Sequence, residues 1–439
     1  MELKKRELIE RIKKREAKIA VIGLGRVGLP TAVIFANVGF RVIGVDVSRK
    51  IIATISKGKS PYAEPNLDNL LKKAIKMGKL KTTTNTTGAA KEADVAVVCV
   101  QTPLTEDKKP NLSYLEAACE DVAEGLSSGK LVAIESTVPP RTTKELIAPL
   151  LEKKSGLKCK TDFWLAYCPE RIAPGKAIQE FVENPRIVGG HDKESAEIAA
   201  ELFRTVVKGG VLVTDCVNAE VAKLAENTFR DVNIAFANEL ALICEHLGAD
   251  VTEVIKLANT HPRVNVHRPG CGVGGPCLPK DPYLLLHGVK TARFRSKVIG
   301  PSRELNDLMP EHTIELVVKA LKKAGKDIKK SKIAVLGVAY KEDVNDVTNS
   351  PAERIIKRLR SLGAKVFVFD PYCEESFGAR KATNIWGAVK DAECMIICTG
   401  HKILRELKID KLKIFMGNNP VIIGGERIIN PVKWKEKGI

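Results

Sequence analysis

Residues 18–28 of this chain read KIAVIGLGRVG, and this stretch decides the fold of the sequence around it. Lys18–Ile22 is an apolar run of strand length, and the glycine pattern GxGxxG follows it directly. The residues downstream predict a helix over Leu29–Val38 and a second strand over Arg41–Val45, which ends at Asp46. A lone GxGxxG is weak evidence. A glycine turn between a strand and a helix, with an acidic residue after the next strand, is typical of a dinucleotide-binding βαβ unit.

The same turn predicts how a dinucleotide is held. Its glycines let a pyrophosphate reach the N-terminus of the helix, where the helix dipole favours anions. Asp46 is placed to bind the ribose hydroxyls and to repel a 2′-phosphate, so the sequence favours NAD over NADP, although Arg49 and Lys50 weaken that preference. The residues of the turn expected to contact the cofactor are Gly23, Gly25, Arg26, Val27 and Gly28.

Three further apolar runs are each followed by polar residues. Strands are expected over Ala93–Val100, Leu131–Glu135 and Phe163–Cys168. Ligands of parallel α/β sheets bind at the carboxyl ends of the strands, so Thr102 and Thr137 are candidates to touch the cofactor or the substrate. Turn-forming hydroxyl groups are the alternative interpretation of these two threonines.

Glu170 and Arg171 follow the third of these strands. A carboxylate in this position can act as a general base for water, and an arginine can clamp an anion. A surface ion pair is the alternative interpretation.

A long helical pattern over about 218–246 contains neither Pro nor Gly. Within it Lys223, Asn227 and Arg230 are spaced by four and three residues, which places them on one face of the helix. A lysine, an amide and an arginine in one stripe suit an anionic ligand or a developing oxyanion, whereas a solvated helix face is the alternative. The uninterrupted helix is also a candidate connector and dimer core between two α/β domains.

A glycine-rich loop at residues 270–281 reads GCGVGGPCLPKD. It presents Cys277 at the end of a flexible backbone, with the carboxylate of Asp281 four residues later. A thiol in such a place can act as a covalent nucleophile. A buried and inert cysteine is the alternative, and Cys271 is interpreted in that way.

After this loop the alternation of strands and helices starts again, without a second GxGxxG, which indicates a different ligand such as a mononucleotide. The expected strands are Lys332–Lys341, Lys365–Pro371, Cys394–Thr399 and Val421–Ile423. The sequence therefore predicts an α/β fold in which two Rossmann-like doubly wound domains are joined by a long central helix and a helical dimerisation region. The predicted domains are an NAD-binding domain over residues 1–212, a central helical domain with the cysteine loop over 213–310, and a second Rossmann-like domain over 311–439.

Composition narrows the class of protein further. The 439 residues carry a formal net charge of +18, but acidic residues are interleaved with the basic ones and only 5% of residues are aromatic. Anionic small molecules are therefore favoured as partners, and nucleic acid is not expected. The absence of a long apolar run and the charged N-terminus predict no membrane partner and a cytoplasmic location. The eleven cysteines form no Cys-x-x-Cys pair and the histidines do not cluster with them at ligand spacing, so reduced thiols and no metal site are expected.

Seven motifs, taken in order over about Lys18–Asn430, resemble those of the UDP-glucose/GDP-mannose dehydrogenase family. They are GLGRVGLP, QTP, ESTVPP, CPER, AKLAENTFR, GVGGPCLPKD and GVAYKEDVNDVTNSP. The resemblance implies that NAD accepts two hydrides in turn from C6 of a UDP-sugar, which becomes a uronate. It also implies that residues 311–439 bind the UDP-sugar and that the protein is a homodimer or a larger homo-oligomer.

The resemblance further assigns roles to individual residues. Cys277 would form a thiohemiacetal with the intermediate aldehyde, and the thioester that follows would be hydrolysed. Lys223 and Asn227 would stabilise the oxyanion, and Asp281 and Glu170 would handle the hydrolytic water together with Thr137. His261 and Arg263 resemble residues that reach the partner subunit's substrate. The full set of substrate-binding candidates is Arg171, Ile172, Lys223, Asn227, Arg230, His261, Arg263, Gly274, Tyr340, Lys341 and Arg427.

Two segments, CPERIAPG at 168–175 and HPRVN at 261–265, resemble the branch of the family that oxidises UDP-N-acetyl-D-mannosamine. UDP-glucose dehydrogenases typically carry a second Glu where this chain has Pro174. The same chemistry on UDP-N-acetylglucosamine or UDP-glucose is the nearest alternative, and a two-electron hydroxyacid dehydrogenase is a more distant one. Thr348 stands where many members have an Arg that contacts NAD, which puts that contact in doubt.

Overall fold

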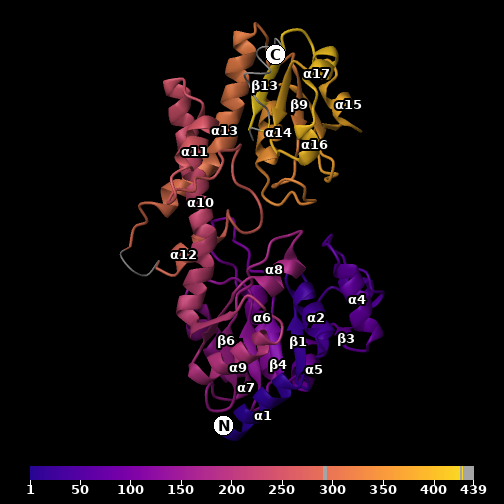
Figure 1. Cartoon of the computed structure of the whole chain (residues 1–439), viewed down its shortest axis with the longest axis vertical. Coiled ribbons are helices and arrows are strands. Elements are labelled where there is room, and N and C mark those ends of the chain that lie inside the picture. The colour runs from indigo at the N-terminus through magenta and orange to yellow at the C-terminus, as the bar shows by residue number, and fades with distance from the viewer. Residues whose placement is uncertain (290–293, 426–427, 429–439) are drawn as a thin grey trace. The chain divides into compact units, whose positions relative to one another are not determined.

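The chain forms two compact units in the computed structural model, which describes residues 1–289, 294–425 and 428 (Figure 1). The first unit comprises Met1–Glu226 and Tyr283–Phe294, and the second comprises Asn227–Pro282 and the described part of Arg295–Ile439. Helices α10 (Cys216–Leu247) and α12 (Asp281–His287) pass from one unit into the other. Each unit has its own sheet and its own hydrophobic cores.

The first unit is built on an eight-stranded sheet. Its strands are β1 (Lys18–Ile22), β2 (Arg41–Val45), β3 (Leu80–Thr83), β4 (Val95–Val98), β5 (Leu131–Ile134), β6 (Trp164–Tyr167), β7 (Arg186–Gly190) and β8 (Val211–Asp215). They lie in the order β3-β2-β1-β4-β5-β6-β7-β8, and β6 pairs with β7 antiparallel whereas the other neighbours are parallel. The first six positions have the Rossmann order, which confirms the predicted dinucleotide-binding topology.

Helices cover both faces of this sheet. They are α1 (Glu2–Lys13), α2 (Gly28–Asn37), α3 (Arg49–Ser56), α4 (Leu67–Lys76), α5 (Thr86–Glu92), α6 (Ser113–Glu124), the π-helical turn η1 (Thr143–Ile147), α7 (Ala148–Ser155), α8 (Ala177–Glu183) and α9 (Lys193–Arg204). Strand residues alternate between the two cores with the period of two that strands impose. In β1, Ile19 and Val21 join the core with α1, α2 and α9, whereas Ala20 and Ile22 join the core with α5, α6 and α7.

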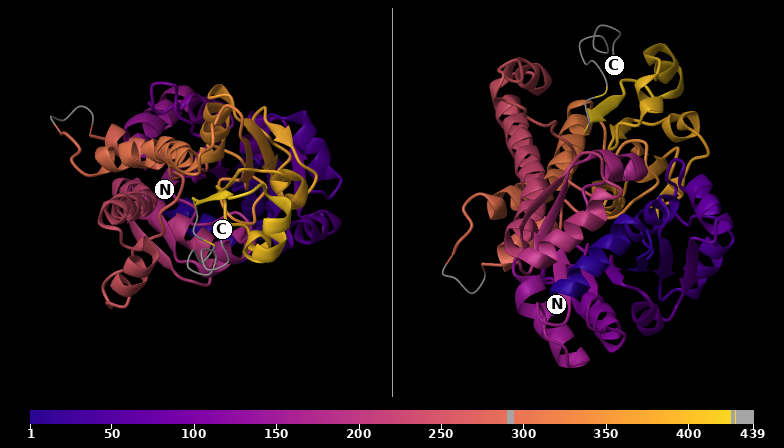
Figure 2. Two further views of the ribbon diagram at one scale, coloured as in Figure 1. Left: turned by 90° about the horizontal axis from the view of Figure 1, so that it is seen from above. Right: turned by 60° about the horizontal axis from the view of Figure 1, so that its bottom comes forward.

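The second unit repeats the plan with five parallel strands in the order β11-β10-β9-β12-β13, so the second doubly wound sheet is also confirmed. The strands are β9 (Lys332–Leu336), β10 (Lys365–Phe369), β11 (Arg380–Lys381), β12 (Cys394–Ile397) and β13 (Val421–Gly424), the last of which is the bright yellow arrow in Figure 2. The helices are α11 (Val251–Ala258), α13 (Ile299–Lys323), α14 (Pro351–Ser361), α15 (Ile385–Val389), α16 (Lys402–Arg405) and α17 (Ile409–Phe415).

Helices α10 and α13 lie side by side within the second unit (Figure 1), and buried polar contacts join them. Arg303 Nη1 donates to Asp231 Oδ1 at 2.5 Å, and Asn238 Nδ2 donates to Asn306 Oδ1 at 2.9 Å. These pairs fix the register of two long helices, because one partner left without the other would be buried and unsatisfied. Among the described residues, no helix has both the length and the apolar character to cross a membrane.

Six strands are shorter than the sequence predicts; β4 and β9 differ most, and each of these two has a physical reason. Strand β4 ends at Val98, because Cys99 leaves the sheet and its backbone packs against Gly23, where a Cβ would lie 2.8 Å from Cys99 O. Strand β9 ends at Leu336, because Gly337 turns the chain with φ +81°. Local sequence patterns did not predict β7 or β8.

Candidate active site

The glycine turn is shaped for close approach of a ligand. Gly23 has φ +92°, and a Cβ on Gly28 would lie 1.8 Å from Gly23 O, so both positions require glycine for the turn itself. A Cβ on Gly25 would meet nothing within 4 Å among the described residues, so the backbone there borders open space. Gly25 lies just before the N-terminus of α2, which is where a pyrophosphate binds in a dinucleotide site.

Asp46 and a tyrosine that sequence reasoning missed lie beside this turn. Asp46 Oδ2 accepts a hydrogen bond from Leu24 N at 3.0 Å, which ties the carboxylate to the glycine turn. The guanidinium carbon of Arg26 lies 5.6 Å from the ring centroid of Tyr62, a cation–π distance. Burial raises the pKa of Tyr62, and the charge of Asp46 raises it further, which indicates that the two side chains are neighbours. No sequence signal marks Tyr62, because it lies in an irregular segment.

The loops after β4 and β5 are bound to each other. Thr102 Oγ1 donates to Thr137 O at 2.6 Å, and Ser136 Oγ donates to Val100 O at 2.7 Å. The two threonines singled out in the sequence are therefore neighbours, at the carboxyl ends of adjacent parallel strands. The hydroxyl of Thr102 has a structural role of its own, and its contact with a ligand stays a prediction.

A buried ionic group lies beneath this edge of the sheet. Arg186 forms an ion pair with Glu135, whose other oxygen accepts from Thr31 Oγ1 at 3.1 Å and from Cys99 Sγ at 2.8 Å. Burial lowers the pKa of Arg186 to about 9, which still leaves it charged at neutral pH. The guanidinium also stacks over Phe203, 4.3 Å from the ring centroid. The sequence analysis did not identify Arg186, because its strand carries no functional motif.

Glu170 and Lys223 form a second buried pair. Lys223 Nζ donates to Glu170 Oε1 at 2.9 Å, and less than a tenth of the lysine side chain is exposed. Glu170 Oε2 accepts from Ile172 N at 2.7 Å, which shapes the turn after β6. Arg171 instead pairs with Glu226, at 2.6 Å and with partial exposure. The carboxylate predicted to activate water and the lysine predicted to meet an oxyanion are therefore in direct contact.

Asn227 lies one turn further along α10 and holds a different carboxylate. Its Nδ2 donates to Asp281 Oδ2 at 2.6 Å, and Asp281 is fully buried. Asp281 begins α12, and its backbone N–H donates to Cys277 O at 2.8 Å. Asp281 is thus attached both to the helix stripe and to the half-buried cysteine of the glycine loop. Arg230, the third member of the predicted stripe, is exposed.

The cysteine loop packs on the second Rossmann-like sheet through its glycines. A Cβ on Gly274 would lie 2.9 Å from Tyr340 Cβ, and one on Gly275 would lie 2.8 Å from the Tyr340 ring. Gly275 N donates to Thr348 O at 2.8 Å, and Asn349 Nδ2 donates to Gly275 O at 3.1 Å. The structure therefore brings together Gly274 and Tyr340, two residues that the sequence singled out separately. Thr348 therefore contacts the cysteine loop through its backbone carbonyl.

The remaining substrate candidates make no contact with the cysteine loop or the buried ion pairs described above that the structure shows among its described residues. Lys341 follows Tyr340 and is exposed, and so are His261 and Arg263, where Arg263 N donates to His261 Nδ1 at 3.3 Å. Arg427 lies outside the described residues. The residues from Val338 to Tyr340 lie at the switch point between β9 and β12, the position where ligands of open α/β sheets bind.

Three family models match the chain in the order of its parts. All belong to the UDP-glucose/GDP-mannose dehydrogenase family: the NAD binding domain matches residues 17–207, the central domain residues 217–308, and the UDP binding domain residues 334–431. The chain belongs to this family. It is an NAD-dependent dehydrogenase, and the prediction of NAD from the glycine turn and Asp46 is confirmed. The UDP binding domain accounts for the second Rossmann-like sheet.

Relatives in this family extend over almost the whole chain. A UDP-N-acetyl-D-mannosamine dehydrogenase of Pyrococcus horikoshii is 43% identical over 96% of this chain and 99% of its own, and one of Campylobacter jejuni is 41% identical over 91% and 98%. The solved structure of the UDP-D-ManNAc dehydrogenase from Pyrococcus horikoshii has a TM-score of 0.89 at 42% identity, covering 94% of this chain and 96% of that one. A UDP-glucose dehydrogenase of Pyrobaculum islandicum has a TM-score of 0.85 at 28% identity, covering 96% of each chain.

Proposed function

We propose that this protein oxidises C6 of UDP-N-acetyl-D-mannosamine to a carboxylate, giving UDP-N-acetyl-D-mannosaminuronate in a four-electron reaction. The full-length relatives of that activity support the choice of sugar. The packing of the Cys277 loop on Tyr340, within the unit that contains the UDP binding domain, is the observation that carries the covalent chemistry. A nucleotide-sugar bound at that switch point has its sugar end available to the loop.

In the proposed mechanism two polar side chains of α10, Lys223 and Asn227, each have a carboxylate partner. NAD, held at the turn of Gly23–Gly28 and by Asp46, supplies the hydride acceptor for both oxidations. The thiolate of Cys277 adds to the aldehyde carbon, and Lys223 and Asn227 donate hydrogen bonds to the oxyanion that forms. Their existing bonds to Glu170 and Asp281 hold both donors in place before the substrate arrives.

Hydrolysis of the thioester requires a base for water. Glu170 and Asp281 are the buried carboxylates in contact with the oxyanion donors, and we propose that they accept the proton of the attacking water, with Thr137 as a further contact. The acid is then released, and Cys277 is left as a thiol. The sum of the steps removes two hydrides from C6 and adds one oxygen atom from water.

A panel of UDP-sugars, with NADH counted per uronate formed, tests the proposed reaction. We expect two NADH per product with UDP-N-acetyl-D-mannosamine and the largest kcat/KM for that substrate. Turnover confined to UDP-glucose or UDP-N-acetylglucosamine would reject the choice of sugar. One NADH per substrate, without acid, would reject the four-electron reaction.

A serine at position 277 tests the covalent step. We expect Cys277→Ser to lower the rate of acid formation by more than about 100-fold, because a hydroxyl is a far weaker nucleophile than a thiolate. Cys271→Ala is the matched control, since Cys271 belongs to the same loop but is buried in the hydrophobic core. Acid formation by the serine variant at the parental rate would contradict the thioester mechanism.

The proposal includes a homodimer formed through α10. Phe229, Phe236 and Ile243 are spaced by seven residues and are 64%, 50% and 48% exposed, and Leu247 extends the stripe at 76%. Large apolar side chains repeated every seven residues form a seam on one side of a helix, as a partner helix requires. A cytoplasmic location is also part of the proposal, and the eleven thiols support it because such groups persist in a reducing compartment.

A further inference from the structure

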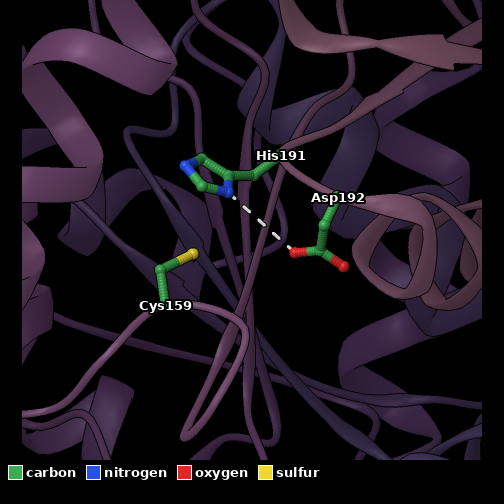
Figure 3. Close-up of side chains that lie close together, drawn as sticks. All are labelled: Cys159, His191 and Asp192. Carbon is green, nitrogen blue, oxygen red and sulfur yellow. Dashed lines mark ion pairs between the residues drawn. The ribbon is translucent and has the colours of Figure 1, made fainter.

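Cys159, His191 and Asp192 converge in the first unit (Figure 3), and none of them is assigned to the reaction. Cys159 lies in the loop between α7 and β6, His191 directly follows β7, and Asp192 caps the N-terminus of α9. The sequence predicted no metal site, because it contains no Cys-x-x-Cys pair and the histidines do not cluster with the cysteines at ligand spacing. Pairing of β6 with β7 brings His191 to Cys159 across 32 positions of sequence.

The three side chains have the spacing of a nearly formed coordination shell. Their ligand atoms all lie within 4.8 Å of one another, and His191 Nδ1 is 3.9 Å from Asp192 Oδ2. Zinc bonds of about 2.0–2.3 Å in a tetrahedron place neighbouring ligand atoms about 3.2–3.8 Å apart, so the shell is complete once these separations shorten by about 1.6 Å or less.

One of the proposed ligand atoms, His191 Nδ1, lacks a hydrogen-bond partner among the described residues. This nitrogen atom is also buried. A buried polar atom without a partner destabilises the folded state, and a bound cation removes that cost. Neutral imidazole is the form that binds metals.

We propose that Cys159, His191 and Asp192 bind one Zn²⁺, with water as the fourth ligand. A thiolate, an imidazole and a carboxylate suit this borderline-soft cation, and the two negative charges neutralise it. Metal binds the thiolate form of cysteine. Binding therefore forms one Zn–S bond and releases one proton from Cys159 to solvent. Asp192 keeps its cap bonds to Glu194 N and Ser195 N through Oδ1, and Oδ2, which accepts from Ser195 Oγ at 2.8 Å, has a further lone pair for the metal.

The site has a structural role in the fold. Cys159 precedes β6 and Glu170 follows it, so the cluster lies at the amino-terminal edge of the parallel strands, opposite the edge that binds the cofactor. A zinc ion there connects the loop before β6 to the end of β7 and to α9. The Cys159 backbone N–H already donates to Glu152 Oε1 at 3.0 Å, which braces the loop for this purpose. Zinc is therefore expected to stabilise the first unit without entering the reaction.

Metal binding by the full chain tests the proposal directly. The metal-free protein is titrated with ZnCl₂, and its Co²⁺ complex is examined for a thiolate charge-transfer band and tetrahedral d–d bands. We expect one tight zinc site per chain. The site should also be present in Cys277→Ser, which would show that the thiol proposed to react with the substrate is not a zinc ligand. We expect Cys159→Ser and His191→Gln each to weaken zinc binding by more than about 100-fold. This is more than the loss that follows when a residue hydrogen-bonded to a metal ligand is removed.

Controls separate the cluster from adventitious metal. Cys119→Ala removes a buried thiol of the same unit that lies outside the cluster, and it should keep both the affinity and the spectrum. Zinc should also raise the melting temperature of the parent and of Cys119→Ala but not of His191→Gln. Equal zinc affinity in all variants, or a Co²⁺ complex without a thiolate band, overturns the proposal. If Cys159→Ser does not fold, His191→Gln decides the question alone.

Discussion

At the scale of single residues, Glu220 shows how burial makes a carboxyl group sensitive to pH. It is fully buried at the start of α10, and its oxygens accept from Arg141 N at 2.5 Å and Thr143 N at 2.8 Å. Burial raises its pKa from 4.5 to about 7. The group therefore keeps its proton in the folded protein at pH values where the unfolded chain has lost it.

The sign of the resulting pH dependence follows from proton linkage. Between about pH 4.5 and 7 the folded state binds more protons than the unfolded state, so the free energy of unfolding decreases as the pH rises. The rise in the pKa of Glu220 from 4.5 to about 7 corresponds to about 3 kcal/mol of the free energy of unfolding. This contribution is fully present below pH 4.5 and is lost above pH 7. Glu220→Gln should lack this component when urea unfolding is compared at pH 5 and pH 8. Glu145→Gln, at an exposed site nearby, should keep it; identical pH profiles for the Glu220 variant and the parent would contradict the assignment.

At the scale of elements, the loop that follows β9 is held by a buried aspartate and histidine. Asp370 Oδ2 accepts from Val338 N at 2.7 Å and Ala339 N at 3.0 Å, and it lies 3.0 Å from His401 Nε2. His401 Nδ1 in turn accepts from Asp343 N at 2.9 Å. Burial alone would raise the pKa of Asp370, but the bonds from His401 and the backbone hold it well below its usual value. Both ends of the segment that carries Tyr340 and Lys341 are therefore fixed by one hydrogen-bonded pair, Asp370 and His401.

Asp370→Asn is expected to loosen this loop and weaken binding of the UDP-sugar. An amide cannot accept all of these bonds, so we expect KM to rise by about tenfold, equivalent to about 1.4 kcal/mol, with a smaller change in kcat. Calorimetric titration with UDP measures the same loss without turnover. Glu374→Gln, at an exposed site of the same sheet region, is the control and should bind UDP as the parent does. A loss of kcat with unchanged KM would mean that the pair does not position the nucleotide loop.

At the scale of the whole molecule, the proposed dimer is the property that depends on the exposed face of α10. Phe236→Asp places a charge in the middle of the apolar stripe, where it would be desolvated by a partner helix. We expect light scattering to give the mass of a monomer for this variant and at least twice that mass for the parent. Val318→Asp, at an exposed position on α13, is the control and should keep the parental mass. A parent that is monomeric at working concentration would reject the dimer.

Local patterns in the sequence predicted the two doubly wound sheets, the long helix and the cofactor. The glycine turn and Asp46 follow from spacing within one βαβ unit, which is a property of about thirty consecutive residues. The long helix follows from an uninterrupted apolar period, and its observed bounds, Cys216–Leu247, differ from the predicted ones by two residues or fewer. Strand β7 escaped prediction because it ends in two glycines, which carry no side-chain period, and β8 because its side chains are not buried and show no alternation.

The sequence by itself determined the family, the order of the nucleotide-binding parts and the set of chemically capable residues, because these depend on residue type and on local spacing. Only the tertiary structure decided which of those residues are partners. Lys223 meets Glu170 and Asn227 meets Asp281, although 53 and 54 positions separate them. Cys159 meets His191 because β7 runs antiparallel to β6, which local pattern does not reveal. Contacts of this kind are set by strand order and helix packing, and these minimise the free energy of the whole chain rather than of any segment.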